Sequence, residues 1–141
     1  MTERVPSDHA TVDSHRVNLE TVGRTGRPRV PLPDALDHDA EEILRISLEG
    51  TGAHTRVTAD LRGEPGIEEA YPDAQLARTG NGENRFVAWV NRHGLAAGDP
   101  LLFDVVTPGY GYGLRRPGER IVYDAVEAPD DGLSDIAEKF G

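Results

Sequence analysis

Residues 83–106 constrain the fold most, because they predict a short amphipathic helix, a turn and a buried strand in direct succession. Four apolar side chains recur at the spacing of one helix face, whereas a strand would alternate apolar and polar positions. They are Phe86, Val87, Trp89 and Val90. Gly94 follows them, and a left-handed glycine commonly ends a helix. A Gly98-Asp99 turn then leads into an apolar run at 101–106, so we expect a helix at 83–93 that packs on β-structure, with Trp89 buried.

The rest of the chain divides into short strand-like runs separated by turn residues. The predicted strands lie at residues 15–22, 28–32, 43–48, 55–61, 70–78, 100–106 and 121–126, and residues 49–52 join two of them as a hairpin. Residues 107–120 are glycine-rich and predict a hairpin or a bulged strand. About seven short strands with one clear helix predict a mainly β protein, a small closed or nearly closed barrel.

Three segments follow from this pattern. Residues 1–13 are predicted to be a flexible N-terminal lead, and residues 14–127 to be the β-barrel domain. Residues 128–141 are predicted to be a C-terminal tail that contains a short helix at 133–140.

The composition narrows the class of protein. The chain has 141 residues, of which 37% are hydrophobic, enough for one domain with a modest core. It contains no cysteine, so we expect neither a disulfide framework nor a thiolate metal site. The charged N-terminus does not resemble a secretory signal, and no apolar run approaches the ~20 residues that span a bilayer. The sequence therefore predicts a cytoplasmic protein without membrane contact.

The charge pattern indicates adaptation to salt. Asp and Glu number 25 against 15 basic residues, which gives a formal net charge of −10, and only Lys139 among the basic residues is a lysine. Such an acidic, arginine-rich composition resembles that of proteins from salt-loving archaea, where at about 1 M salt the screening length is roughly 3 Å. The alternative is an ordinary acidic protein that repels nucleic acid. In the halophilic interpretation, the places where arginines gather carry the functional information.

The motif around the helix resembles the plant B3 domain and its relatives of the DNA-binding pseudobarrel fold. In that family an aromatic helix is followed by a Leu-x-x-Gly-Asp turn and a strand with a phenylalanine. The matching residues here are Phe86, Trp89, Val90, Leu95, Gly98, Asp99 and Phe103. Upstream, residues 29–33, the hairpin at 43–61 and the region near Tyr71 follow the family's order of elements.

The resemblance implies an open barrel of seven strands that binds DNA in the major groove through two arms. One arm follows the first strand and here would carry Arg24, Arg27 and Arg29. The other lies between the fourth and fifth strands, at residues 63–69 here. This second segment is acidic, which departs from the family pattern because carboxylates repel phosphates.

Two groups of arginines are the candidate nucleic-acid-binding residues, because guanidinium groups make bidentate contacts with phosphates and guanine edges. The first group is Arg24, Arg27 and Arg29; the second is Arg115, Arg116 and Arg120. The second group lies near Tyr110 and Tyr112, and arginines beside aromatic rings can grip single strands. The alternative for both groups is ion pairing with carboxylates of the same protein.

The remaining polar residues suggest no reaction. The histidines show no metal-ligand spacing, and a weak grouping of His38 with neighbouring aspartates is the nearest approach to a metal site. Asp99 is expected to order its own turn, and Asp104 is expected to face outward from an alternating strand. We therefore predict a binding protein rather than an enzyme, with no metal and no cofactor. DNA is the predicted partner, and the alternative is a barrel that binds another protein.

Overall fold

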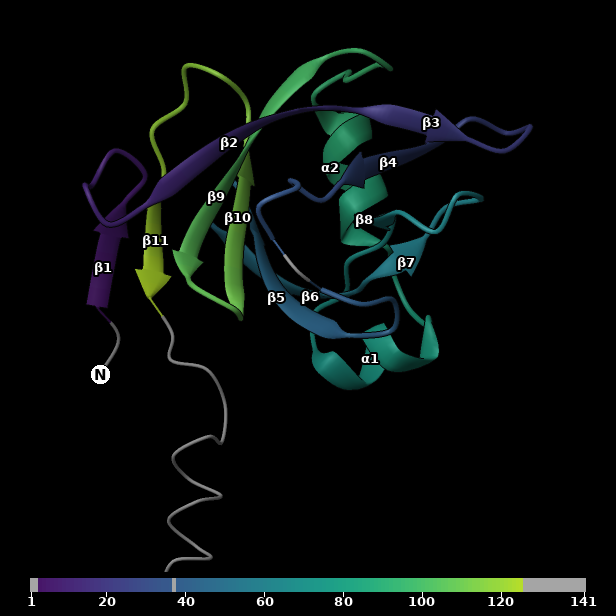
Figure 1. Ribbon diagram of the computed structural model, residues 1–141, viewed down its shortest axis with the longest axis horizontal. Coiled ribbons are helices and arrows are strands. Elements are labelled where there is room, and N and C mark those ends of the chain that lie inside the picture. The colour runs from purple at the N-terminus through teal and green to yellow at the C-terminus, as the bar shows by residue number, and fades with distance from the viewer. Residues whose placement is uncertain (1–2, 37, 126–141) are drawn as a thin grey trace, which may run out of the picture.

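The computed structural model describes residues 3–36 and 38–125, and these residues are mainly β, as predicted (Figure 1). The strands are β1 (Glu3–Pro6), β2 (Asp13–Asn18), β3 (Glu20–Val22), β4 (Arg27–Pro31), β5 (Ile43–Leu48), β6 (Thr51–Arg56), β7 (Thr58–Ala59), β8 (Pro65–Ile67), β9 (Pro100–Thr107), β10 (Gly111–Arg115) and β11 (Val122–Ala125). Two short helices, α1 (Ala74–Thr79) and α2 (Arg85–Arg92), connect β8 to β9. Among the described residues, no helix has the length and apolar character that crossing a membrane requires.

The strands form three sheets. The largest has the order β2-β9-β10-β5-β6, in which β10 and β5 are parallel and the other pairs are antiparallel. A second sheet has the order β3-β4-β8-β7, and β1 pairs with β11 in a third. Within the described ranges these sheets do not form one closed barrel, so the predicted seven-stranded barrel is not established by the strand pairing.

The two larger sheets are linked at both edges. Strand β2 runs into β3 across Leu19, whose amide donates to the carbonyl of Asp99 (2.9 Å). Strand β6 runs into β7 across Val57, whose amide donates to the carbonyl of Glu42 (2.8 Å). Both residues are buried, at 2% and 0% exposure, so the side chain at each junction between the sheets belongs to the core.

The predicted helix at 83–93 is confirmed as α2. Asn84 caps it, since its side-chain oxygen accepts from the amides of Phe86 and Val87, which satisfies two otherwise free donors. Phe86 and Trp89 are buried in the core, at 0% and 2% exposure. The predicted turn is also confirmed, because the Asp99 carboxylate accepts from the amide of Ala96 at 2.8 Å.

The predicted flexible lead at 1–13 contains a strand. Strand β1 pairs with β11, and the amide of Ser7 donates to the carbonyl of Ile121 at 2.7 Å. Of the strand predicted at 121–126, residues Val122–Ala125 form β11, which pairs with the N-terminal segment and lies outside the two larger sheets. Ser7 and Val12 are buried, at 4% and 9% exposure, which gives this segment a packed position.

The predicted strand at 70–78 is wrong, because a helix begins there. Asp73 accepts from the amide of Leu76 as an N-cap, and Gly80 ends α1 in the left-handed conformation. Of the predicted strand only an isolated bridge between Tyr71 and His54 remains. The predicted helix at 133–140 lies outside the described residues.

Candidate functional site

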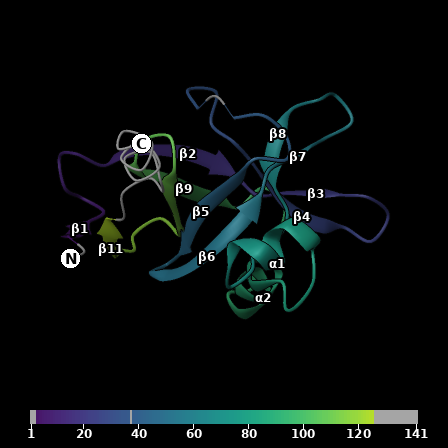
Figure 2. The ribbon, with the colours of Figure 1, turned by 90° about the horizontal axis from the view of Figure 1, so that it is seen from below.

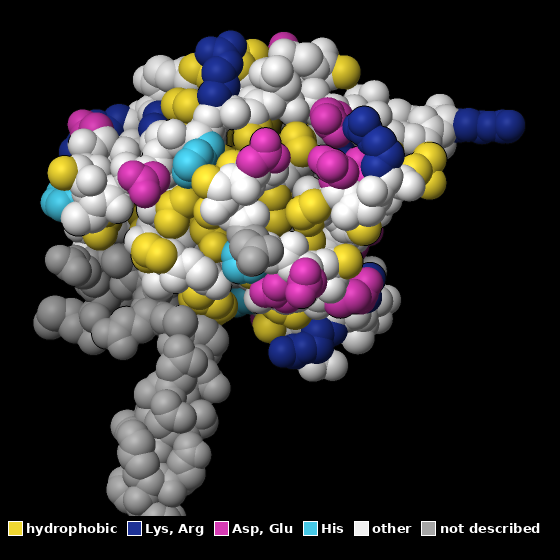
Figure 3. All heavy atoms as spheres, in the orientation of Figure 1, with side chains coloured by type: hydrophobic (Ala, Val, Ile, Leu, Met, Phe, Trp, Pro, Cys, Tyr) yellow, Lys and Arg dark blue, Asp and Glu magenta, His cyan; other side chains and the backbone are white. Residues whose placement is uncertain are grey.

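The β3–β4 hairpin presents the first group of predicted arginines. Its turn at residues 23–26 is closed by the amide of Gly26, which donates to the carbonyl of Gly23 (3.2 Å). Arg24 lies exposed in this turn and forms no ion pair with a carboxylate of the described ranges. The hairpin projects from the body of the protein, at the right in Figure 1, and a basic side chain occupies its end in Figure 3. It is therefore a slender arm with an available positive charge.

A second hairpin, β7–β8, projects from the same sheet. The Asp60 carboxylate accepts from the amides of Arg62 and Glu64, at 2.8 and 2.9 Å, and so orders the turn at residues 60–64. These two amides lower the pKa of Asp60, since they stabilise its charged form. The turn begins three residues before the segment predicted as the second arm (63–69), and residues 65–67 of that segment are strand β8.

Arg29 joins the bases of the two hairpins. Its side chain is 1% exposed and donates to the Glu68 carboxylate (2.7 Å), to the Thr58 hydroxyl (3.1 Å) and to the carbonyl of Glu64 (2.6 Å). Gly66 leaves room for it, because a Cβ at that position would lie 2.6 Å from the guanidinium carbon. Arg29 is therefore a buried structural arginine, and the prediction that it contacts nucleic acid does not fit its position.

The two hairpins diverge from the antiparallel pair β4–β8 (Figure 2). Residues of both hairpins line an open cleft of about 760 Å³. Arg27 borders this cleft, with its side chain 62% exposed and a guanidinium nitrogen 3.6 Å from the Glu68 carboxylate. Residues 20–31 and 58–68 together carry four arginines and four carboxylates. This end of the molecule is thus neutral overall in a chain of net charge −10.

The second group of predicted arginines lies elsewhere, at the connection between β10 and β11. Arg115 donates to Asp104 (2.7 Å), which is fully buried and also accepts from Tyr123 (2.6 Å). Asp104 therefore faces inward, contrary to the prediction, because these partners compensate the loss of water. Burial and the hydrogen bond to Asp104 both raise the pKa of Tyr123.

Arg116 and Arg120 are also paired with carboxylates. Arg116 donates to Glu49 at 2.8 Å, and Glu49 accepts in addition from the indole of Trp89 at 3.1 Å. Glu49 has a positive φ of 49° in the turn between β5 and β6, so three separate elements meet at a residue in an uncommon conformation. Arg120 pairs with Asp8 at 3.1 Å, and both side chains are more than half exposed.

The six predicted arginines therefore do not form one surface. Arg24 and Arg27 share the cleft end of the molecule with Arg62, while Arg29 lies beneath them. The other three lie at the β10–β11 connection, on another side of the molecule (Figure 1). The strand predicted at 55–61 extends into residues that form the turn at 60–64. Sequence reasoning therefore did not recognise Arg62 as a turn residue beside the cleft. The Asp-x-x-Gly pattern of residues 60–63 was the available turn signal.

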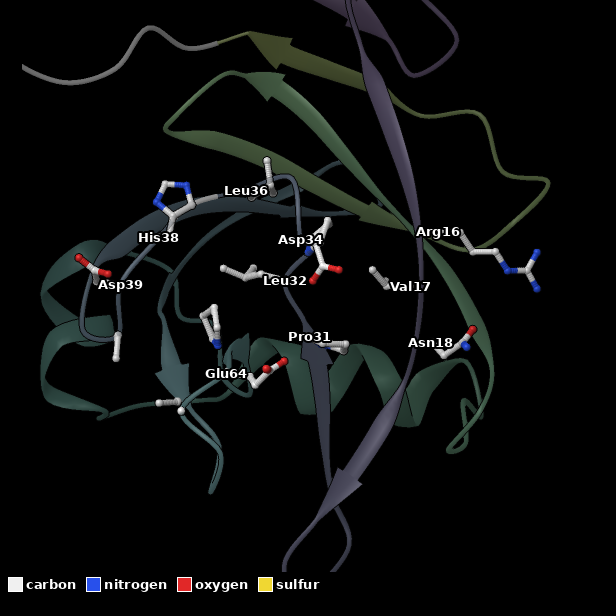
Figure 4. Close-up of a pocket in the computed structure, with 15 residues that line it drawn as sticks. Arg16, Val17, Asn18, Pro31, Leu32, Asp34, Leu36, His38, Asp39 and Glu64 are labelled. Carbon is white, nitrogen blue, oxygen red and sulfur yellow. The ribbon is translucent and has the colours of Figure 1, made fainter.

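A second cavity, of about 620 Å³, lies between β2, the connection from β4 to β5 and the β7–β8 turn (Figure 4). His38 lines it, and its two ring nitrogens lie 3.0 Å from a Glu42 carboxylate oxygen and 2.6 Å from the Tyr112 hydroxyl. Arg16 points away from the cavity. The Glu42 carboxylate and the Tyr112 hydroxyl thus fix the orientation of the His38 ring. Within residues 3–36 and 38–125, no cluster of three or more His, Cys, Asp or Glu could hold a metal ion.

Comparison with known proteins places the chain in a family. The model of a family of unknown function matches residues 1–140, nearly the whole chain. No curated protein and no solved structure matches the sequence.

Proposed function

The chain belongs to DUF7112, a family of unknown function, and we propose that it binds duplex DNA between its β3–β4 and β7–β8 hairpins. The observation that carries this proposal is the local charge balance. The two projecting hairpins place arginines around an open cleft at an end of the molecule that is neutral, in an otherwise strongly acidic chain.

The strand connections support an open barrel as the scaffold. If β2–β3 and β6–β7 are each counted as one bent strand, the two larger sheets comprise seven strand paths. They are β2–β3, β4, β5, β6–β7, β8, β9 and β10. In chain order, the β3–β4 hairpin then follows the first strand path, and the β7–β8 hairpin joins the fourth path to the fifth. These are the positions of the DNA-binding arms that the B3 resemblance implies, so we propose a B3-like scaffold.

The electrostatics of the hairpins support contact with phosphates. Glu68 is paired with Arg29 and Arg27, and the Asp60 carboxylate accepts from two backbone amides. These partners offset much of the repulsion that the sequence alone suggested for the second arm. Arg24 and the exposed Arg27 can reach outward, where a guanidinium forms charge-assisted hydrogen bonds with phosphate oxygens.

The shape of the site supports a duplex rather than a single strand. The major groove is about 12 Å wide and admits a two-stranded β ribbon, whereas single-strand sites combine a basic groove with exposed aromatic rings. The residues that line the cleft between the hairpins include no aromatic side chain.

The test is a titration of a fluorescent duplex at several KCl concentrations, with circular dichroism at each concentration to verify folding. Replacement of Arg24 and Arg27 together by Ala should weaken binding and reduce the slope of log K against log salt by about one for each phosphate that the variant no longer neutralises. The matched control is Arg92→Ala, which removes an exposed arginine at the end of α2, away from both hairpins. It should leave both quantities unchanged.

Two outcomes would contradict the proposal. If the folded wild-type protein binds no duplex at any salt concentration, the alternative of a protein-binding barrel is favoured. If Arg92→Ala weakens binding as much as the double substitution does, the contact is nonspecific attraction to any arginine and the hairpins are not the site.

A further inference from the structure

Leu61 lies at the tip of the β7–β8 hairpin with its side chain entirely in solvent. Its relative exposure is 106%, and it is the only large hydrophobic side chain of the described residues that is exposed. The leucines within the strands are buried or half-buried. A single fully exposed leucine at the end of a projecting turn is available to contact a ligand without rearrangement.

The turn presents Leu61 in a fixed position. The amide of Asp60 donates to the carbonyl of Glu64, and the amide of Gly63 donates to the carbonyl of Asp60, both at 2.9 Å. Below the turn, Arg29 donates to the same Glu64 carbonyl. The hairpin is therefore ordered before it meets a partner, which reduces the entropy cost of binding.

We infer that Leu61 makes apolar contact with the C5-methyl group of thymine in the major groove. This inference rests on the proposed function, because the cleft beside Leu61 is the proposed DNA site. The ~12 Å major groove of B-DNA admits a two-stranded ribbon without being widened, whereas the minor groove is only ~6 Å wide. In the major groove, the thymine methyl is the base-edge group that an aliphatic side chain recognises. Arg62, the next residue, is then placed close to the phosphates of that groove.

The experiment compares two duplexes of the same sequence, one with thymine and one with deoxyuridine at every thymine position. These duplexes differ only in the methyl groups. Wild type should bind the thymine duplex more tightly, by roughly fourfold for each methyl group buried against Leu61. Leu61→Ser should bind both duplexes equally, and Leu61→Met, which keeps an aliphatic chain, should retain the preference.

The outcomes separate this inference from the proposed function. Binding of both duplexes with equal affinity by wild type overturns the thymine contact and leaves DNA binding intact. A preference that persists in Leu61→Ser also overturns it, since another group would then recognise the methyl. Absence of binding to either duplex refutes the proposed function itself. Both variants should have the melting temperature of wild type, because Leu61 contributes nothing to the core.

Discussion

Replacement of Arg29 by alanine tests whether one buried arginine holds the two hairpins together. The substitution removes a guanidinium that is 1% exposed and that donates to Glu68, to the Thr58 hydroxyl and to the carbonyls of Thr58 and Glu64. Removal of one partner of a buried ion pair costs about 3–5 kcal/mol, because the remaining charge stays desolvated. We expect a loss in this range, which corresponds to a fall of roughly 10–20 °C in melting temperature.

Two comparisons distinguish the ion pair from simple loss of packing. Arg29→Met keeps most of the side-chain volume, and the double variant Arg29→Met with Glu68→Met removes both charges. The double variant should lose less stability than the sum of the two single variants, by about 1–3 kcal/mol. The coupling energy between Arg29 and Glu68 should also change little with KCl concentration, since salt screens a buried ion pair weakly.

The assay is urea unfolding at fixed KCl, followed by circular dichroism. The role described for Arg29 is contradicted if the free energy of unfolding of Arg29→Ala lies within about 1 kcal/mol of the wild-type value. It is also contradicted if the losses of the two single variants, at positions 29 and 68, simply add in the double variant.

Three further predictions concern the core, the Glu49 cluster and the acidic surface. Trp89→Ala should cost about 3–5 kcal/mol in urea unfolding, because the indole is 2% exposed, and a loss below about 1 kcal/mol would contradict the packing of α2. Burial raises the pKa of Glu49, but the hydrogen bond and charge of Arg116 lower it by more, so its net pKa lies below the ordinary value of 4.5. A carboxyl pKa that is lower in the folded than in the unfolded state stabilises the fold at pH values above the pKa of the unfolded state. The free energy of unfolding of wild type should therefore exceed that of Glu49→Gln at pH 7, and this difference should shrink as the pH falls below about 4.5. A stability difference between wild type and Glu49→Gln that does not change with pH would contradict the lowered pKa of Glu49. The melting temperature of wild type should rise between about 0.1 M and about 2 M KCl, because screening relieves repulsion among the carboxylates, and equal values would argue against the halophilic interpretation.

The features predicted correctly from the sequence are those that depend on residues close together in the chain. The helix at α2 followed from four apolar residues on one face, and the Gly98-Asp99 turn followed from residue types that favour such a turn. Helix α1 was missed because residues 70–78 were predicted to be a strand. Its cap, Asp73, and its terminal Gly80 are themselves a local signal for a short helix.

The candidate site could not be predicted in full, because it depends on ion pairs between residues that are far apart in the chain. Arg29 meets Glu68 across 39 positions, and Arg116 meets Glu49 across 67, so no local pattern distinguishes these arginines from Arg24. Asp104 was predicted to face outward because side chains alternate between the two faces of a strand. Its burial depends on Arg115 and Tyr123, which only the fold brings to it.

The most direct test of the account is to map the DNA contact on the folded protein by NMR. Amide chemical shifts of the labelled protein are followed while an unlabelled duplex is added at constant KCl. We predict that the shifted amides cluster in residues 20–31 and 58–68, the two hairpins that enclose the cleft. Shifts concentrated at Arg115, Arg116 and Arg120, or no shift at a duplex concentration well above that of the protein, would contradict the central claim.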